Sequence, residues 1–147
     1  MWMLVRKNAI SSDGDGTRLL AASPDSADRG DAWRWSVRSV LDPGGQRRIT
    51  VEADEHAVRS SSTDHSDGES LDLERRPGDQ IVLTLTQGEA LIADRHGPWR
   101  RWLSAGDVFV VEGEEQESLR LTLTPGHGEA RVIRLEPIGD VPLRWVP

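Results

Sequence analysis

The feature that most constrains the fold of this chain is a series of short segments in which apolar and polar residues alternate. Successive side chains of a β-strand point to opposite faces, so such alternation predicts strands that bury one face. The clearest cases are residues 80–86 and 118–124, where every second residue is leucine or isoleucine. Residues 108–111 form a continuous apolar run instead, which suits a strand buried on both faces.

Further segments of this kind recur along the chain at intervals of about 8 to 12 residues, with glycine and proline between them. They cover residues 2–5, 17–22, 32–41, 48–53, 71–73, 89–93, 99–103 and 130–135. No segment shows a helical period of comparable strength. The sequence therefore predicts an all-β sandwich or barrel over residues 1–147 as a single domain. Within it, the Ser-, Asp- and His-rich residues 54–68 predict a long polar loop, and residues 137–147 predict an irregular C-terminal tail.

Composition excludes several kinds of site and partner. The chain has no cysteine, which rules out disulfides, thiolate zinc sites and cysteine nucleophiles. Its formal net charge of −7 argues against nucleic acid or an anionic membrane as the main partner. No apolar run reaches the ~18 residues that a membrane span needs, and the first ten residues do not resemble a signal peptide. We therefore expect a cytoplasmic protein, and exposed sheet edges favour a homodimer.

Two motifs narrow the β class. In the second half, the strand at 80–86 is followed by a Gln87-Gly88 turn, a return strand, a Gly106-Asp107 turn and the apolar run at 108–111. In the first half, Lys7-Asn8 and Gly16-Thr17-Arg18 precede the segment Trp33-Arg34-Trp35-Ser36. Together these motifs resemble the HutD/Ves family, over roughly residues 5–136. The resemblance implies a cupin-type jelly roll, that is, a double-stranded β-helix barrel with extra N-terminal strands, rather than a defined activity.

The chain departs from that family at two positions. Leu19 stands where the family usually has glutamate after Thr-Arg, and Gln80 follows Asp79 where an arginine is common.

Many cupins hold a metal through two histidines one residue apart, a nearby carboxylate and a later histidine. None of the four histidines here has that spacing, and the acidic residues 112–115 stand where the later histidine would lie. We therefore expect neither a metal nor another cofactor. The alternative is an adventitious metal site formed by neighbouring polar residues, namely His56, His65, Asp54, Glu55 and Asp64. His96 and His127 fall in predicted turns and are expected to face solvent.

Candidate ligand-binding residues are cations and tryptophans of the first half. If the opening segment lines the barrel mouth, Lys7, Asn8 and Arg18 are placed to hold a carboxylate or phosphate. Trp33 and Trp35 share one strand face and suit a flat or apolar ligand. The alternative for the cations is a solvated surface position, and for the tryptophans it is core packing.

Candidates for catalysis are His56 and three carboxylates, Asp79, Glu89 and Glu112. Burial in a barrel raises the pKa of a carboxyl group and makes it a useful acid or base. Asp107 is expected to be a turn residue that bonds backbone. Two functions follow: a metal-independent protein that binds a small organic ligand, anionic or partly apolar, in the barrel, or a metal-independent isomerase, epimerase or cyclase. Only the second requires an interior group with a perturbed pKa. A third alternative is a barrel with a filled interior that acts through its surface.

Overall fold

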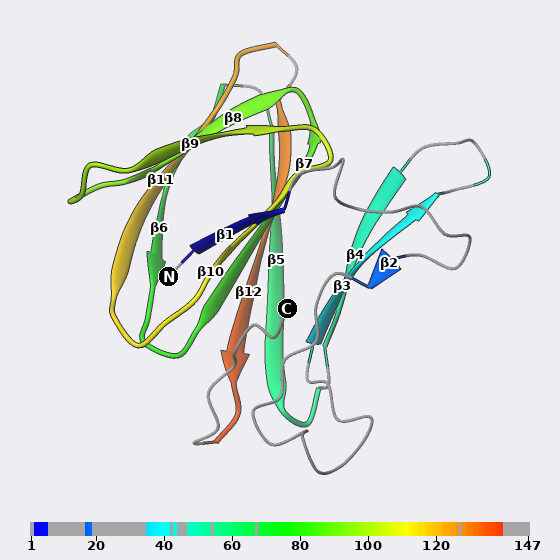
Figure 1. Ribbon diagram of the computed structural model, residues 1–147, viewed down its shortest axis with the longest axis vertical. Coiled ribbons are helices and arrows are strands. Elements are labelled where there is room, and N and C mark those ends of the chain that lie inside the picture. The colour runs from blue at the N-terminus through cyan, green and yellow to red at the C-terminus, as the bar shows by residue number, and fades with distance from the viewer. Residues whose placement is uncertain are drawn as a thin grey trace.

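The structure is a computed structural model that describes residues 2–5, 17–18, 35–41, 43, 47–53, 55–66, 68–126 and 128–139. These residues form twelve strands (Figure 1). The strands are β1 (Trp2–Val5), β2 (Thr17–Arg18), β3 (Trp35–Leu41), β4 (Arg47–Ala53), β5 (Val58–Ser66), β6 (Ser70–Arg75), β7 (Gln80–Gln87), β8 (Glu89–Asp94), β9 (Arg100–Ser104), β10 (Val108–Val111), β11 (Glu117–Leu123) and β12 (Glu129–Pro137). In this part of the chain there is no helix with the length and apolar character needed to cross a bilayer.

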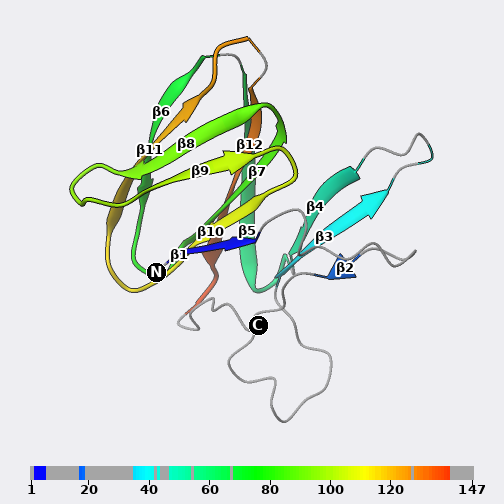
Figure 2. The ribbon, with the colours of Figure 1, turned by 45° about the horizontal axis from the view of Figure 1, so that its top comes forward.

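Two antiparallel sheets form the barrel. The larger has the strand order β1-β10-β7-β12-β5, and the smaller has the order β6-β11-β8-β9. Figures 1 and 2 show the two sheets facing each other, so that β1 and β9 are edge strands of opposite sheets. A third sheet, β2-β3-β4, lies outside the barrel on the β5 side, in both views. The fold is therefore all-β, a double-stranded β-helix with extra N-terminal strands, as the sequence predicts.

The strand alternation places the apolar side chains between the two sheets. On the larger sheet, Leu83 pairs with Phe109 on one side and with Val132 on the other, and all three face inward. The smaller sheet contributes the leucines of β11 and their neighbours. The buried cluster comprises Leu73, Ile81, Leu83, Leu85, Ala90, Ile92, Leu103, Phe109, Val111, Leu119, Leu121, Leu123, Ala130 and Val132. Apolar packing of this kind supplies most of the free energy that stabilises the barrel.

The outer face of the larger sheet is also buried. Val82, Val108 and Val110 point away from the barrel interior and are at most 1% exposed. Ile133 and Leu135 of β12 continue this apolar face. Burial on both faces explains the uninterrupted apolar run at 108–111 and confirms its prediction as a buried strand.

The prediction of a polar loop at residues 54–68 is wrong, because most of this segment is β5. The strand pairs with β12 along its whole length, from Val58 opposite Pro137 to Ser66 opposite Glu129. As the edge of the sheet it leaves most of its side chains exposed, so no apolar alternation marks it. The tail also begins later than predicted, since β12 runs to Pro137, while residues 140–147 lie outside the described residues.

The Gly106-Asp107 turn returns the chain to the sheet before β10. Gly106 has a φ of 90°, which favours glycine, and its N–H donates to the carbonyl oxygen of Leu85 at 2.8 Å. The buried carboxylate of Asp107 accepts a hydrogen bond from the backbone N–H of Ser104 at 2.9 Å. This contact confirms Asp107 as a turn residue.

Candidate functional site

Three aromatic rings lie together where the edge strands β1 and β9 of the two sheets approach each other. The ring centroids of Trp2 and Phe109 are 5.5 Å apart, those of Trp2 and Trp99 5.6 Å, and those of Trp99 and Phe109 6.0 Å. Phe109 is fully buried in the core, whereas Trp2 and Trp99 are half-buried. We call these three residues the aromatic seam, because they connect the apolar core to the protein surface.

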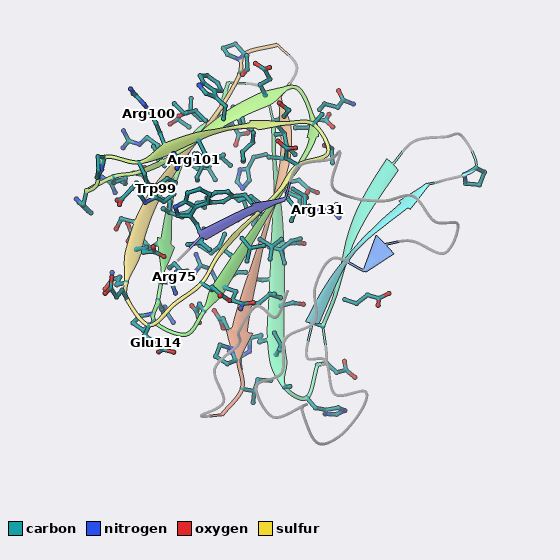
Figure 3. The ribbon with its side chains drawn as sticks, viewed as in Figure 1. Arg75, Trp99, Arg100, Arg101, Glu114 and Arg131 are labelled. Atoms are coloured by element: carbon teal, nitrogen blue, oxygen red, sulfur yellow. The ribbon has the colours of Figure 1, made fainter. Side chains whose placement is uncertain are left out.

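Strand pairing explains why these side chains point inward. Trp2 pairs with Val111, a core residue of β10, and so lies on the inner face of its sheet. Trp99 immediately precedes β9 and is two residues from Arg101, which pairs with the core residue Ile92. Figure 3 shows Trp99 and Arg101 on the barrel side of β9, whereas Arg100 extends away from the barrel.

Arg101 places a cation on the aromatic seam. Its guanidinium carbon lies 4.5 Å from the centroid of the Trp2 ring, within the range of a cation–π contact. Its Nη1 donates to the carbonyl oxygen of Arg100 at 2.7 Å. The side chain is half-buried, and among the described residues no carboxylate forms an ion pair with it. The seam therefore combines ring surface with a positive charge that no described carboxylate pairs with.

A second inward-facing arginine, Arg75, lies at the end of β6 and is fully buried (Figure 3). Its Nε donates to Glu117 Oε2 at 2.8 Å. Its two terminal nitrogens donate to the backbone carbonyl oxygens of Arg76, Asp79, Gly113 and Glu115. We call Arg75 and these partners the Arg75 cluster. Because the cluster holds the turn before β7 against the loop after β10, its role is structural.

Asp79, one of the predicted catalytic candidates, belongs to the Arg75 cluster through its backbone carbonyl oxygen and is only 6% exposed. Its Oδ2 has no hydrogen-bond partner and lies 3.7 Å from Arg134 Nη1. Burial raises the pKa of the Asp79 carboxyl group, the nearby Glu136 carboxylate adds to the increase, and Arg134 opposes it. Asp79 is therefore an interior group of the kind that acid–base chemistry needs.

The other catalytic candidates lie in less enclosed positions. His56 is exposed in the turn between β4 and β5, and Glu89 is exposed at the start of β8. Glu112 is half-buried and accepts a hydrogen bond from Gln80 Nε2 at 2.8 Å. Gln80 itself is fully buried, and its Oε1 has no hydrogen-bond partner.

The ligand-binding residues predicted from the first half lie outside the seam or outside the described residues. Lys7, Asn8 and Trp33 belong to the second group. Arg18 lies on β2 opposite Arg38, and Trp35 lies on β3, so both are on the three-stranded sheet outside the barrel. That sheet is beside β5, the edge of the larger sheet opposite to β1. The prediction that Arg18 and Trp35 hold a ligand stays untested.

Sequence reasoning missed Trp2 and Arg101 as site residues, although one signal was present. Trp99 and Arg101 are two residues apart on one strand, and a strand places such residues on the same face. Trp2 gave no comparable signal, because its pairing with β10 joins residues more than a hundred positions apart.

In the part of the chain that the structure describes, no group of three or more His, Asp or Glu side chains could hold a metal ion. His65 instead forms hydrogen bonds through both ring nitrogens, to Thr63 Oγ1 at 2.8 Å and to Glu69 Oε2 at 2.9 Å. The bond from His65 lowers the pKa of the Glu69 carboxyl group.

No protein-family profile and no curated protein matches this chain. Among solved structures, it is similar to the conserved protein of unknown function PA5104 from Pseudomonas aeruginosa PAO1. The TM-score is 0.63 at 14% identity, over 94% of this chain and 100% of that one. RmlC from Streptococcus suis, in complex with dTDP-D-xylose, gives a TM-score of 0.43 at 12% identity, over 87% and 74% of the two chains.

A de novo designed double-stranded β-helix gives a TM-score of 0.43 at 21% identity, over 53% of this chain and 99% of the design. At these identities, likeness speaks for the fold alone. The fold that the two facing sheets establish for this chain is a double-stranded β-helix, and the similarity to PA5104 over 94% of the chain agrees with it.

Proposed function

We propose that the protein binds a small organic molecule with a flat or apolar body at the aromatic seam. The observation that carries this proposal is that two indole rings, Trp2 and Trp99, are half-exposed while Phe109 supports them from the core. Ligand sites are commonly lined by aromatic side chains with a few polar groups that fix orientation. Arg101 is such a group.

The site is placed at the seam rather than at the centre of the barrel. Leucine, isoleucine and valine side chains occupy the inward positions of β7, β11 and β12, and they are almost completely buried. Since protein interiors pack at nearly the density of organic crystals, side chains of this size leave a ligand little room between the sheets.

The proposal is tested by titrating the protein with naphthalene-2-carboxylate and following the indole N–H signals by NMR. Trp99→Ala is expected to weaken binding about tenfold or more, because it removes one ring from the seam. Trp102→Ala is the matched control, since Trp102 is 59% exposed and lies on the opposite face of β9. Equal affinity of the wild type and Trp99→Ala contradicts the proposal.

A second candidate function, an isomerase, epimerase or cyclase, is favoured by one observation. Asp79 is buried, lacks a hydrogen bond at Oδ2 and has a raised pKa, which suits a group that moves a proton near neutral pH. A titration of the Asp79 side-chain carbon by NMR tests this candidate. If Asp79 titrates in its ordinary range, or if Asp79→Asn keeps full activity toward an identified substrate, Asp79 is not the acid or base.

A relationship to the HutD/Ves family is also proposed rather than established. It is supported by the turns at Gln87-Gly88 and Gly106-Asp107, which connect β7 to β8 and β9 to β10 as the resemblance implies. Alignment of homologous sequences that include residues 7–19 tests it, and the absence of the Lys-Asn and Thr-Arg motifs from those sequences contradicts it.

A further inference from the structure

We infer that Arg101 selects ligands that carry a planar carboxylate, and that the carboxylate binds the Nε and Nη2 edge of its guanidinium group. This inference rests on the proposed function, because it names the chemical class of the ligand held at the aromatic seam. It goes beyond that function because a flat ligand without charge would also bind indole rings.

The protein itself shows how its arginines bind carboxylates. Arg120 donates from Nε to Asp72 Oδ1 at 2.9 Å and from Nη2 to Asp72 Oδ2 at 3.4 Å. Arg131 donates in the same way to the two oxygens of Asp64, at 2.8 and 3.3 Å. Both pairs use the edge formed by Nε and Nη2, whose two parallel N–H groups match the two oxygens of one carboxylate.

In Arg101 this same edge has no acceptor among the described residues. Within those residues its guanidinium group forms one hydrogen bond, from Nη1 to the carbonyl oxygen of Arg100. The guanidinium carbon lies over the Trp2 ring, so this contact and that hydrogen bond together restrain the group. Nε and Nη2 are therefore donors with no acceptor in the part of the chain that the structure describes.

The absence of an ion pair at Arg101 contrasts with most other described arginines. Asp and Glu outnumber Lys and Arg by 25 to 18, so acidic side chains are abundant. Six other described arginines each form an ion pair with at least one of them: Arg59, Arg75, Arg95, Arg120, Arg131 and Arg134. Three arginines whose side chains are described form none with a described carboxylate: Arg76 and Arg100 are exposed, whereas Arg101 faces the barrel and is half-buried. Partial burial of a cation beside apolar rings is unfavourable without a counter-charge, and a ligand anion would supply it.

A carboxylate fits this arrangement better than a phosphate does. One guanidinium edge offers two coplanar donors, which a planar carboxylate uses completely. A tetrahedral phosphate carries more charge and more acceptor oxygens than one such edge can satisfy, and the neighbouring Arg100 is directed away from the barrel (Figure 3). The expected ligand is therefore an aromatic or otherwise flat monocarboxylate, with its body against Trp2 and Trp99.

The test compares naphthalene-2-carboxylate with its neutral isostere naphthalene-2-carboxamide, each titrated into the wild-type protein and two variants by calorimetry. The wild type is expected to bind the acid about ten- to a hundredfold more tightly than the amide. Arg101→Gln is expected to remove this preference while keeping the affinity for the amide. Arg100→Gln is the matched control, because it removes the adjacent cation and should leave the preference intact.

The outcomes separate this inference from the function on which it rests. If acid and amide bind the wild type equally, or if Arg101→Gln keeps the preference for the acid, the inference fails while the seam remains a binding site. If neither compound binds, the proposed function fails with it. Arg101→Lys tests whether the two parallel N–H donors of arginine are required. It keeps the positive charge, but it should recover less than half of the preference for the acid over the amide if both donors are needed.

Discussion

Two inward-facing arginines, Arg75 on β6 and Arg101 on β9, lie on the two edge strands of the smaller sheet and have opposite surroundings. Arg75 is fully buried and donates to Glu117 and to four backbone carbonyl oxygens. Arg101 is half-buried and has, among the described residues, one hydrogen bond, to a neighbouring carbonyl oxygen, and one ring contact. The same side chain therefore stabilises the architecture where its donors are filled, and we propose that it binds a ligand where they are left open.

The largest expected effect tests the structural half of this comparison. Arg75→Met should lower the free energy of unfolding by about 3 to 5 kcal/mol, because it removes the buried donor of Glu117 and of four buried or partly buried carbonyl oxygens. Urea unfolding followed by tryptophan fluorescence measures the loss. Arg120→Gln, which breaks an exposed ion pair with Asp72, should cost far less than Arg75→Met, because solvent screens exposed ion pairs. A similar loss for both variants means that the Arg75 cluster is not a structural centre.

An intermediate effect concerns Asp79. Its backbone carbonyl oxygen accepts a hydrogen bond from Arg75, but its side-chain Oδ2 has no hydrogen-bond partner. The pKa of the Asp79 carboxyl group is raised in the folded protein, chiefly by burial. The folded state therefore holds this proton at pH values where the unfolded state has lost it, so unfolding free energy falls as pH rises through that window. Asp79→Asn removes the fall, and the variant should match or exceed the wild type at pH 7 by up to about 1 kcal/mol.

Asp72 provides a control of opposite sign for this pH dependence. A hydrogen bond from Arg120 lowers the pKa of the exposed Asp72 carboxyl group. Asp72 therefore contributes stability above its unfolded pKa, and the contribution is lost as pH falls through the folded pKa. Unfolding curves for Asp79→Asn and Asp72→Asn between pH 3 and pH 7 should diverge from the wild type in opposite directions. Parallel curves contradict the assignment of the Asp79 pKa to burial.

The smallest expected effect on stability belongs to Arg101. Arg101→Gln removes one hydrogen bond and a cation–π contact, which together should change the free energy of unfolding by less than about 1 kcal/mol. Thermal unfolding of the ligand-free protein measures this directly. A loss as large as that of Arg75→Met would assign Arg101 to the architecture of the barrel and end the contrast between the two residues.

The fold could be predicted largely because strands that bury one face show alternating apolar and polar residues in the sequence. Val108–Val111 was predicted to the residue, since a strand buried on both faces is apolar at every position. Val58–Ser66 was missed because an edge strand with exposed hydroxyl side chains shows no such pattern. Its pairing with β12 is visible only in three dimensions.

The candidate site could be predicted only in outline. Asp79 was recognised as a candidate from its place beside a strand, but its burial and missing hydrogen bond depend on the folded chain. From sequence alone an arginine is expected to be a solvated surface charge. Neither the many hydrogen bonds of Arg75 nor the lack of a described acceptor at Nε and Nη2 of Arg101 could therefore be inferred. Both properties depend on backbone groups and rings contributed by distant segments.

The pairing of β1 with β10 has a consequence for the order of folding. Trp2 of the aromatic seam lies opposite Val111, so its position depends on a contact between residues more than a hundred positions apart. Closing so large a loop has a high entropic cost, and such contacts form slowly and late. During synthesis, the seam cannot assemble until β10 has left the ribosome and the first strand has docked on it. Binding at the proposed site would therefore report completion of the barrel rather than of any local hairpin.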